Sequence, residues 1–300
     1  MTRLLLSRPS APLVPEAAAS ARPGRTLAGV LPAWTLATLS VLALWFVGYV
    51  LVIGAAQEQG DQQRLFARFR SELSQATAPV GPVAEGKPVA LIDAPRGGIR
   101  RAVVVEGTTS QDLQAGPGHR RDTVLPGQAG VSVVFGKGAT FGAPFKRIDD
   151  LKVGDPISVV TAQGSVTFHV SGRRHAGDPL PAPPAAGAGR LTLVTVEGSG
   201  WRSGWAPTRT TYVDATVDKA QPTTGKVAGV SADEQALATS TDALLPLVLW
   251  LEALLVVVVA GAWATARWGR WQTWLVAAPA LTAVLVGTSR VATTLLPNLF

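Results

Sequence analysis

The sequence contains no cysteine, and this absence excludes disulfide bonds, thiolate metal sites and every cysteine nucleophile. It has only three histidines, so a histidine-rich metal site is not expected. Charged residues are scarce as well, at 16% against about 25% in typical soluble domains. Apolar residues, in contrast, make up 47% of the 300 residues. The composition argues against a purely soluble protein, and we expect neither a metal nor a cofactor.

Three long apolar segments predict membrane-spanning helices. Residues 30–54 carry no charge, and residues 243–266 and 274–296 hold few. About 20 apolar residues are enough for a helix to cross a bilayer. Arginines precede the first span, and the basic stretch 267–273 joins the last two, so these parts belong on the cytoplasmic side. We therefore predict a multi-pass cell-membrane protein with a cytoplasmic N-terminus.

The region between the first and second spans faces outward in this topology. Its charges are nearly balanced, so it offers no basic surface for nucleic acid. We interpret the first span as an uncleaved signal anchor, with cleavage near Gly54-Ala55-Ala56 as the alternative. The predicted segments are a cytoplasmic tail 1–29, the anchor 30–54, a stalk helix and linker 55–87, a β-domain 88–218, a linker 219–242, the span 243–266, a cytoplasmic loop 267–273, the span 274–296 and an extracytoplasmic tail 297–300.

Two charged residues lie at similar depths in the last two spans, Glu252 in one and Arg290 in the other. A charged side chain within a bilayer usually faces a partner. We predict that Glu252 and Arg290 form an intramembrane ion pair across the hairpin. A proton or ion path, or a docking point for another membrane helix, is the alternative.

Short β-branched segments separated by Gly, Pro and Asp fill the β-domain and predict a small barrel or sandwich. Residues 57–74 instead place Leu65, Phe66, Phe69 and Leu73 at helical spacing, which predicts an amphipathic stalk helix. Residues 161–164 predict a hairpin turn. The predicted strands are 89–92, 102–105, 131–135, 157–160, 166–170, 191–196 and 211–213.

Four sequence motifs follow one another in the β-domain. They are Val105-Glu106-Gly107-Thr108-Thr109 with Gly116-Pro117-Gly118-His119; Leu125-Pro126-Gly127-Gln128-Ala129-Gly130; the stretch 133–145 ending in Phe141-Gly142-Ala143-Pro144-Phe145, with Leu151-Lys152-Val153-Gly154-Asp155 after it; and Leu191-Thr192-Leu193-Val194-Thr195-Val196 followed by Arg209. Their order resembles the sortase family, the membrane-anchored cysteine transpeptidases of Gram-positive bacteria, and in particular its class E-like actinobacterial branch. The resemblance covers residues 87–217 and implies an eight-stranded β-barrel. With the three spans, the predicted fold class is mainly β plus three transmembrane helices.

The resemblance also implies a catalytic site. In the family a cysteine attacks the carbonyl of an LPXTG-like sorting signal, a histidine handles the proton, and an arginine stabilises the oxyanion or positions the substrate. The matching positions here hold Val196, Lys137 and Arg209. Valine has no lone pair with which to attack, and lysine stays charged at neutral pH unless it is buried. We therefore predict a pseudoenzyme without catalytic residues that retains Arg209.

Three functions stay open at this point. The favoured one is a non-catalytic protein that binds or scaffolds a cell-surface polypeptide or cell-wall component and contacts a membrane-protein partner through its last two spans. The second is a hydrolase or transpeptidase with a serine or threonine nucleophile and Lys137 as its base. The third is a structural membrane protein whose barrel is a spacer.

The candidate cleft-binding residues are few, and each has an alternative role. Arg209 binds a carboxylate or is a surface charge, and the Pro-rich loop 177–190 is a lip over the cleft or a passive loop. Tryptophan on an exposed loop is typical of a binding site, although core packing is the alternative. We expect His119, His169 and His175 to be ordinary polar residues. The candidate residues are Lys137, Val196, Arg209, Trp201 and Trp205.

Overall fold

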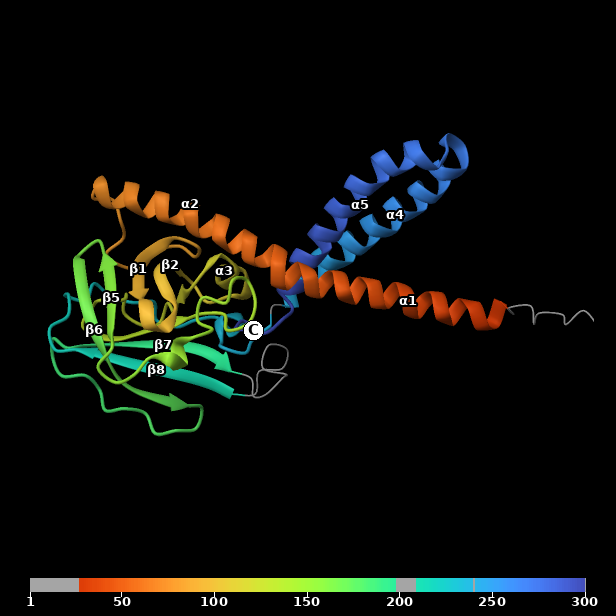
Figure 1. The fold of residues 1–300 in the computed structure, drawn as a ribbon. Helices are drawn as coiled ribbons and strands as arrows, with labels where there is room; N and C mark the ends of the chain where they lie inside the picture. Colours follow the sequence, from red (N-terminus) through yellow and green to blue (C-terminus); the bar gives the residue numbers. More distant parts are fainter. Residues whose placement is uncertain (1–26, 198–208, 240, 300) are drawn as a thin grey trace, which may run out of the picture. The chain divides into compact units, whose positions relative to one another are not determined.

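A computed structural model of the chain describes residues 27–197, 209–239 and 241–299. The chain forms two compact units, residues 1–44 and 45–300. Helix α1 (Leu27–Gly48) begins in the first unit, and a five-residue π-helix, η1 (Tyr49–Ile53), and helix α2 (Gly54–Ser74) follow it along the chain (Figure 1). The barrel, the remaining helices and the candidate site all belong to the second unit.

A closed barrel of eight strands forms the centre of this unit, in the order β1-β2-β3-β4-β7-β8-β6-β5. The pairs β2–β3 and β4–β7 are parallel, and the other neighbours are antiparallel. All seven predicted strands and the turn at 161–164 are confirmed, whereas the two-residue β3 was not predicted. The strands are β1 (Pro88–Ala94), β2 (Ile99–Glu106), β3 (Gly118–His119), β4 (Gly130–Phe135), β5 (Pro156–Thr161), β6 (Gly164–His175), β7 (Gly189–Glu197) and β8 (Arg209–Val217).

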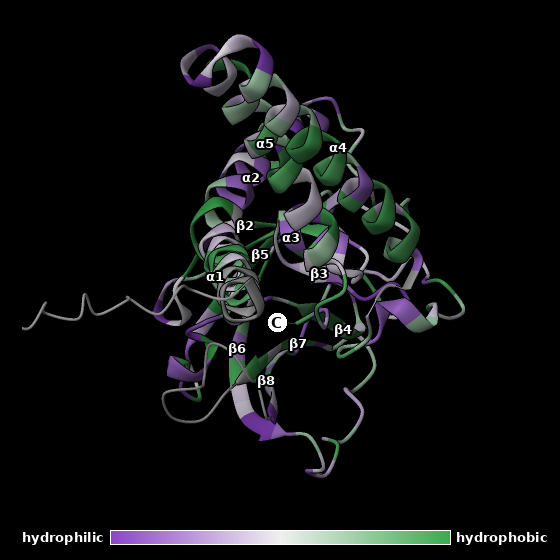
Figure 2. Cartoon of the chain, turned by 90° about the vertical axis from the view of Figure 1, so that its right-hand side faces the viewer, coloured by the Kyte–Doolittle hydropathy of each residue, from purple (hydrophilic) through white to green (hydrophobic). Residues whose placement is uncertain are grey.

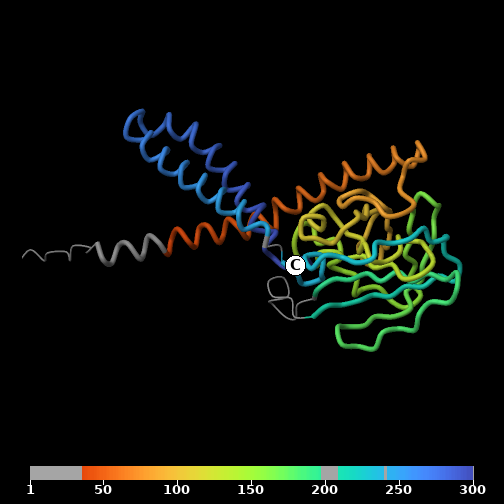
Figure 3. The backbone as a smooth tube through the Cα atoms, turned by 180° about the vertical axis from the view of Figure 1, so that it is seen from behind, coloured from red at the N-terminus to blue at the C-terminus, as the bar shows by residue number. Residues whose placement is uncertain are grey.

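Alternation of side chains places the core inside the barrel. In β6, Val166, Phe168 and Val170 are buried, while the residues between them are exposed. Strand β1 is buried along most of its length because α2 lies over β1 and β2 (Figures 1 and 3). The Gln62 side chain of α2 donates to the Val103 carbonyl (3.1 Å) and accepts from the Val103 amide (2.8 Å). The predicted stalk helix is therefore present, and it packs on the barrel.

Among the described residues, three helices are long and apolar enough to cross a membrane: the continuous helix Leu36–Ser74, α4 (Leu244–Trp268) and α5 (Arg270–Thr293). Apolar residues run along α4 and α5 (Figure 2). The long helices hold more residues than the eight strands together, so the fold class is mixed and the prediction of a mainly β protein is wrong. The reason is that the strands are short, whereas α2 extends the first apolar helix by 21 residues.

The predicted ion pair between Glu252 and Arg290 is not formed in the described part of the chain, where both side chains are exposed. The last turn of α5 instead lies against the short helix α3 (Ser110–Ala115), where Gln114 Nε2 donates to Thr293 Oγ1 (3.2 Å). Arg290, one turn before Thr293, lines a pocket with Asp242. Docking of the end of α5 on α3 thus places Arg290 beside the barrel domain.

Candidate functional site

The ends of β4 and β7 bring Lys137 and Val196 together. These two strands are parallel neighbours, and the Gly136 amide extends their pairing by donating to the Val194 carbonyl (3.0 Å). The Thr195 hydroxyl then donates to the Gly136 carbonyl (2.9 Å). Lys137 follows directly, beside the last residues of β7. We call the two strand ends, residues 135–138 and 194–197, the Lys137–Val196 site.

Gly138 allows the main chains of this site to approach each other closely. A Cβ atom at position 138 would lie 2.5 Å from the Val196 carbonyl oxygen and 2.9 Å from Thr195 Oγ1. We therefore expect Gly138→Ala to destabilise the barrel by about 1–3 kcal/mol, because the added methyl forces the strand ends apart. Thermal unfolding in detergent measures this loss. Gly172→Ala is the matched control, since nothing lies within 4 Å of a Cβ there; equal melting temperatures of the two variants would contradict the close approach.

The Lys137 side chain is buried, with 1% of its surface exposed. Its Nζ donates to the main-chain carbonyl of Asn298 (3.0 Å) and lies 5.5 Å from the centroid of the Phe141 ring. Burial disfavours the charged ammonium and lowers the pKa of Lys137 to about 7. The amine is therefore partly neutral at neutral pH, and it donates a hydrogen bond in either protonation state.

Residues 294–299, which follow α5, occupy the Lys137–Val196 site; we call this segment the α5 extension. The Gly138 amide donates to the Leu299 carbonyl (3.3 Å). The Leu299 side chain is completely buried. The extension thus fills the site with its own main chain and one leucine. The apolar cluster around this leucine contains Leu113, Phe135, Val194 and Val196, with Val133, Tyr212 and Ala236 at its edge.

Asn298 fastens the extension to the segment that precedes α4. Its main-chain amide donates to the Ala238 carbonyl (3.1 Å). Its side-chain Nδ2 donates to the carbonyls of Asp233 (2.6 Å) and Gln235 (2.7 Å). Asn298 is fully buried, so these bonds satisfy groups that water does not reach. The sequence analysis predicted residues 297–300 only as an extracytoplasmic tail. No pattern in the sequence indicated that Asn298 binds the segment before α4.

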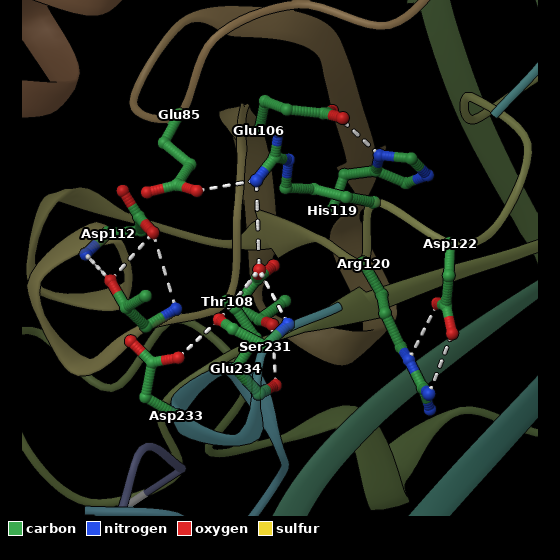
Figure 4. Close-up of polar contacts among 12 residues, drawn as sticks. Glu85, Glu106, Thr108, Asp112, His119, Arg120, Asp122, Ser231, Asp233 and Glu234 are labelled. Atoms are coloured by element: carbon green, nitrogen blue, oxygen red, sulfur yellow. Dashed lines mark hydrogen bonds and ion pairs between the residues drawn. The ribbon is translucent and has the colours of Figure 1, made fainter. Parts of the chain in front are cut away.

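A polar network fixes that segment to the barrel (Figure 4). The Thr108 hydroxyl donates to the Glu234 carbonyl (2.7 Å). The Arg121 guanidinium lies 2.5 Å from a Glu85 carboxylate oxygen and 3.7 Å from one of Glu234. Burial raises the pKa of the nearby Asp112 carboxyl, which caps α3, to about 6. The segment that holds Asn298 is therefore itself anchored to the barrel domain through Thr108, in the connection from β2 to α3, and through Arg121, which follows β3.

Of the other candidate cleft-binding residues, the structure describes Arg209 but neither tryptophan. Arg209 is exposed at the start of β8, where it is paired in register with Glu197, one position beyond the pair of Val196 with Thr210. Trp201 and Trp205 lie outside the described residues. The Arg209 main chain is therefore next to the site, and the contacts of its side chain with a ligand stay a prediction.

The three histidines have local partners. His119 is buried, and its Nδ1 lies 2.8 Å from a carboxylate oxygen of the equally buried Glu106 (Figure 4). His169 Nδ1 lies 3.2 Å from the Gly154 carbonyl oxygen, and His175 Nδ1 lies 3.2 Å from Thr211 Oγ1. These contacts agree with ordinary polar roles.

An open groove of about 540 Å³ lies beside the site, along β4, β7 and β8. It shares Phe135, Tyr212 and Ala236 with the surroundings of Leu299. The Pro-rich loop 177–190 lines it through Leu180 and two prolines, so this loop is a lip of the groove. Three arginines contribute to the wall; the lining residues are Arg120, Val131, Val133, Phe135, Arg174, Leu180, Pro181, Pro183, Arg190, Thr192, Tyr212, Gln235 and Ala236.

Two of these arginines have a carboxylate partner. Arg174 pairs with Asp214 (2.8 Å) and lies over the Tyr212 ring, 4.2 Å from its centroid. Arg120 pairs with Asp122 (2.8 Å). Arg190 instead donates to two main-chain carbonyls of the lip, at positions 181 and 182. Arg190 therefore gives the groove a positive charge, and no carboxylate among the described residues neutralises it.

Comparison with known proteins shows which family the barrel resembles. Residues 92–201 match the Sortase family, described as a sortase domain. Sortase D of Bacillus subtilis (strain 168) is 33% identical over 67 residues, which are 22% of this chain and 32% of that protein. The chain thus matches about a third of the length of this curated relative. Over residues 92–201 the barrel is therefore similar to a sortase domain.

Solved structures similar to this chain are also sortases. The SrtA sortase from Actinomyces oris is 28% identical, with a TM-score of 0.39, over 46% of this chain and 85% of that one. The SrtF sortase from Corynebacterium diphtheriae is 24% identical, with a TM-score of 0.40, over 51% and 95%. Sortase E from Streptomyces avermitilis is 24% identical, with a TM-score of 0.36, over 51% and 100%.

The sequence alone shows one chemical difference between this sortase-like barrel and a cysteine transpeptidase. The chain has no cysteine at any position. Catalysis by a cysteine thiolate is therefore impossible in this protein.

Proposed function

We propose that this chain is a membrane-anchored, non-catalytic sortase-like protein that binds an extracytoplasmic polypeptide in the Lys137–Val196 site and the adjoining groove. One observation carries the proposal. The site hydrogen-bonds a polypeptide main chain through Lys137 Nζ and the Gly138 amide, and it buries an apolar side chain against Val196. It thus has the means to hold a polypeptide, whereas the valine at the position expected for the nucleophile cannot attack one.

The membrane helices complete this proposal. Three apolar helices are more than a single anchor requires, so α4 and α5 provide a surface for a membrane-protein partner. The charge distribution supports a cytoplasmic N-terminus and an extracytoplasmic barrel. Within the family, we place the chain in the class E-like actinobacterial branch as a degenerate member. A cell-wall component is an alternative ligand of the groove.

A second candidate function is acyl transfer with a hydroxyl nucleophile and Lys137 as general base. The lowered pKa of Lys137 favours it, since a base must be partly neutral at the working pH. The Thr195 hydroxyl, at the end of β7, does not favour it, because this hydroxyl already donates to the Gly136 carbonyl. We therefore retain the non-catalytic function as the better supported one.

Photo-crosslinking in intact cells tests the proposed function. The photoreactive residue replaces Tyr212 in the groove, Thr167 on the exposed side of β6 as the control, or Leu249 on the exposed side of α4. We expect a discrete adduct of a polypeptide or cell-wall fragment from position 212 and none from position 167. Adducts from position 249 alone would contradict a binding groove and make the barrel a spacer.

A further inference from the structure

The α5 extension fills the Lys137–Val196 site through contacts that another polypeptide can reproduce. Lys137 Nζ and the Gly138 amide donate to main-chain carbonyls, which every residue carries. Leu299 supplies one apolar side chain. Only Asn298 uses a specific side-chain group, its amide. The extension pairs with none of the described strands as a further strand of the barrel.

The open groove provides a route by which a competitor can reach these contacts. It borders the pocket of Leu299 at Phe135 and Tyr212 and continues toward Arg190 and the lip. Arg190 Nε is buried without a hydrogen-bond partner in the described structure. A polypeptide that lies along the groove therefore meets an apolar pocket at one end and, at the other, the Arg190 guanidinium, whose charge no carboxylate of the described residues neutralises.

The extension is also joined to the membrane hairpin. The residue before it, Thr293, is fastened to α3, where the Ser110 hydroxyl donates to its carbonyl (3.4 Å) and Gln114 Nε2 donates to its hydroxyl (3.2 Å). The same helix α3 contributes Leu113 to the pocket of Leu299. Movement of the extension out of the site therefore disturbs the attachment of α5 to the barrel.

We propose that the α5 extension is a built-in competitor that closes the Lys137–Val196 site until an extracytoplasmic polypeptide displaces it and releases the end of α5. This inference rests on the proposed function, namely that the site binds a polypeptide. The competing ligand is an extended peptide with a leucine-like side chain for the pocket of Leu299 and an acidic group for Arg190.

The effective concentration of the tethered extension determines how tightly a competing ligand must bind. A short tether gives a bound segment an effective concentration in the millimolar range. A free peptide with the same contacts must therefore reach millimolar concentration to displace the extension. A natural ligand that works at lower concentration must gain additional contacts, and the groove with Arg190 is where they are available.

The thiol reactivity of Leu299→Cys tests this inference in the full-length protein. The chain has no other cysteine, so the variant carries a single reactive group. Leu299 is 0% exposed, so we expect slow labelling by a maleimide. Adding Asn298→Ala, or a synthetic peptide with the sequence of residues 294–299 at millimolar concentration, is expected to raise the rate at least about tenfold. Val153→Cys, 74% exposed, is the fast control, and Val159→Cys, buried in the barrel core, reports unfolding and stays slow.

Each contrary outcome identifies what fails. Labelling of Leu299→Cys as fast as that of Val153→Cys without any addition would overturn the inference, because the extension would not occupy the site. A second experiment crosslinks the same peptide, carrying a photoreactive group, to the protein. If the peptide is crosslinked to the groove while the thiol of the Leu299→Cys variant stays protected, the proposed function stands and the inference falls. If no peptide is crosslinked even to the Asn298→Ala variant, both fall.

Discussion

Replacement of Leu299 by alanine is expected to lower the free energy of unfolding by about 2–5 kcal/mol. The leucine is completely buried among Leu113, Phe135, Val194 and Val196, so its truncation leaves a cavity between two strand ends and a helix. The extension can detach from the barrel without unfolding it. The loss of unfolding free energy in Leu299→Ala therefore cannot exceed the free energy with which the extension docks. Denaturant unfolding of the full-length protein in detergent measures the effect.

The matched control for this experiment is Leu180→Ala. Leu180 is 80% exposed in the lip, so its truncation is expected to change stability by less than about 0.5 kcal/mol. A loss in Leu299→Ala no greater than in Leu180→Ala would show that the extension contributes nothing to the folded barrel. It would also contradict the burial on which the proposed competitor rests.

The stability of the barrel is expected to rise with pH between about pH 7 and pH 10.5 because of Lys137. Burial lowers the folded-state pKa of this lysine to about 7, whereas its ordinary value is 10.5. Between these values the unfolded chain binds more protons than the folded one, so raising the pH favours the folded state. The contribution is at most about 1.4 kcal/mol per pH unit, and below pH 7 the cost of burying the charge is present in full.

Lys137→Met isolates this contribution, because methionine keeps an unbranched side chain of similar length without a titrating group. The stability of the original protein relative to Lys137→Met is expected to increase as the pH rises from about 7 toward 10.5. Lys152→Met, at an exposed position, controls for the loss of one positive charge. A pH-independent difference between the original protein and Lys137→Met would show that the amine is not buried in the folded state.

The residue pattern was sufficient to predict seven of the eight strands, and the sortase resemblance implied that they form an eight-stranded barrel. Its strands are runs of β-branched residues in which burial alternates, as in β6, and glycine or proline separates them. Strand β3 and helix α3 were not predicted, since two and six residues are too few to establish a period. The capping box of α3 is visible in the sequence as Thr109 and Asp112 and could have indicated this helix.

The candidate site could be predicted only in part. The sortase resemblance selected Lys137 and Val196, which the parallel pairing of β4 with β7 places side by side. It could not predict that Lys137 is buried, because the residues that cover it come from a segment about 160 positions later in the chain. Asn298 and Leu299 follow a helix that is long and apolar enough to cross a membrane, and they show no periodicity of their own, so their docking depends on tertiary contacts alone.

The charged residues of α4 and α5 also show that sequence does not predict tertiary partners. Glu252 and Arg290 lie at similar depths along two helices, which made an ion pair the simplest expectation. The structure instead fastens the last turn of α5 to α3 through Thr293, and Arg290 lies beside the barrel. Depth along a helix is readable from sequence, whereas the partner that a helix end docks on is not.

The most direct test of the central claim is intact-mass spectrometry of the purified full-length protein after incubation with a peptide carrying an LPXTG-like sorting signal and an amine acceptor. The Asn298→Ala variant, in which the site is expected to open, is treated in the same way. The account predicts an unmodified protein mass and an uncleaved peptide in both samples, because the site holds Val196 and no thiol. A covalent adduct or a transpeptidation product that disappears in Lys137→Ala would contradict it and establish catalysis by a hydroxyl nucleophile.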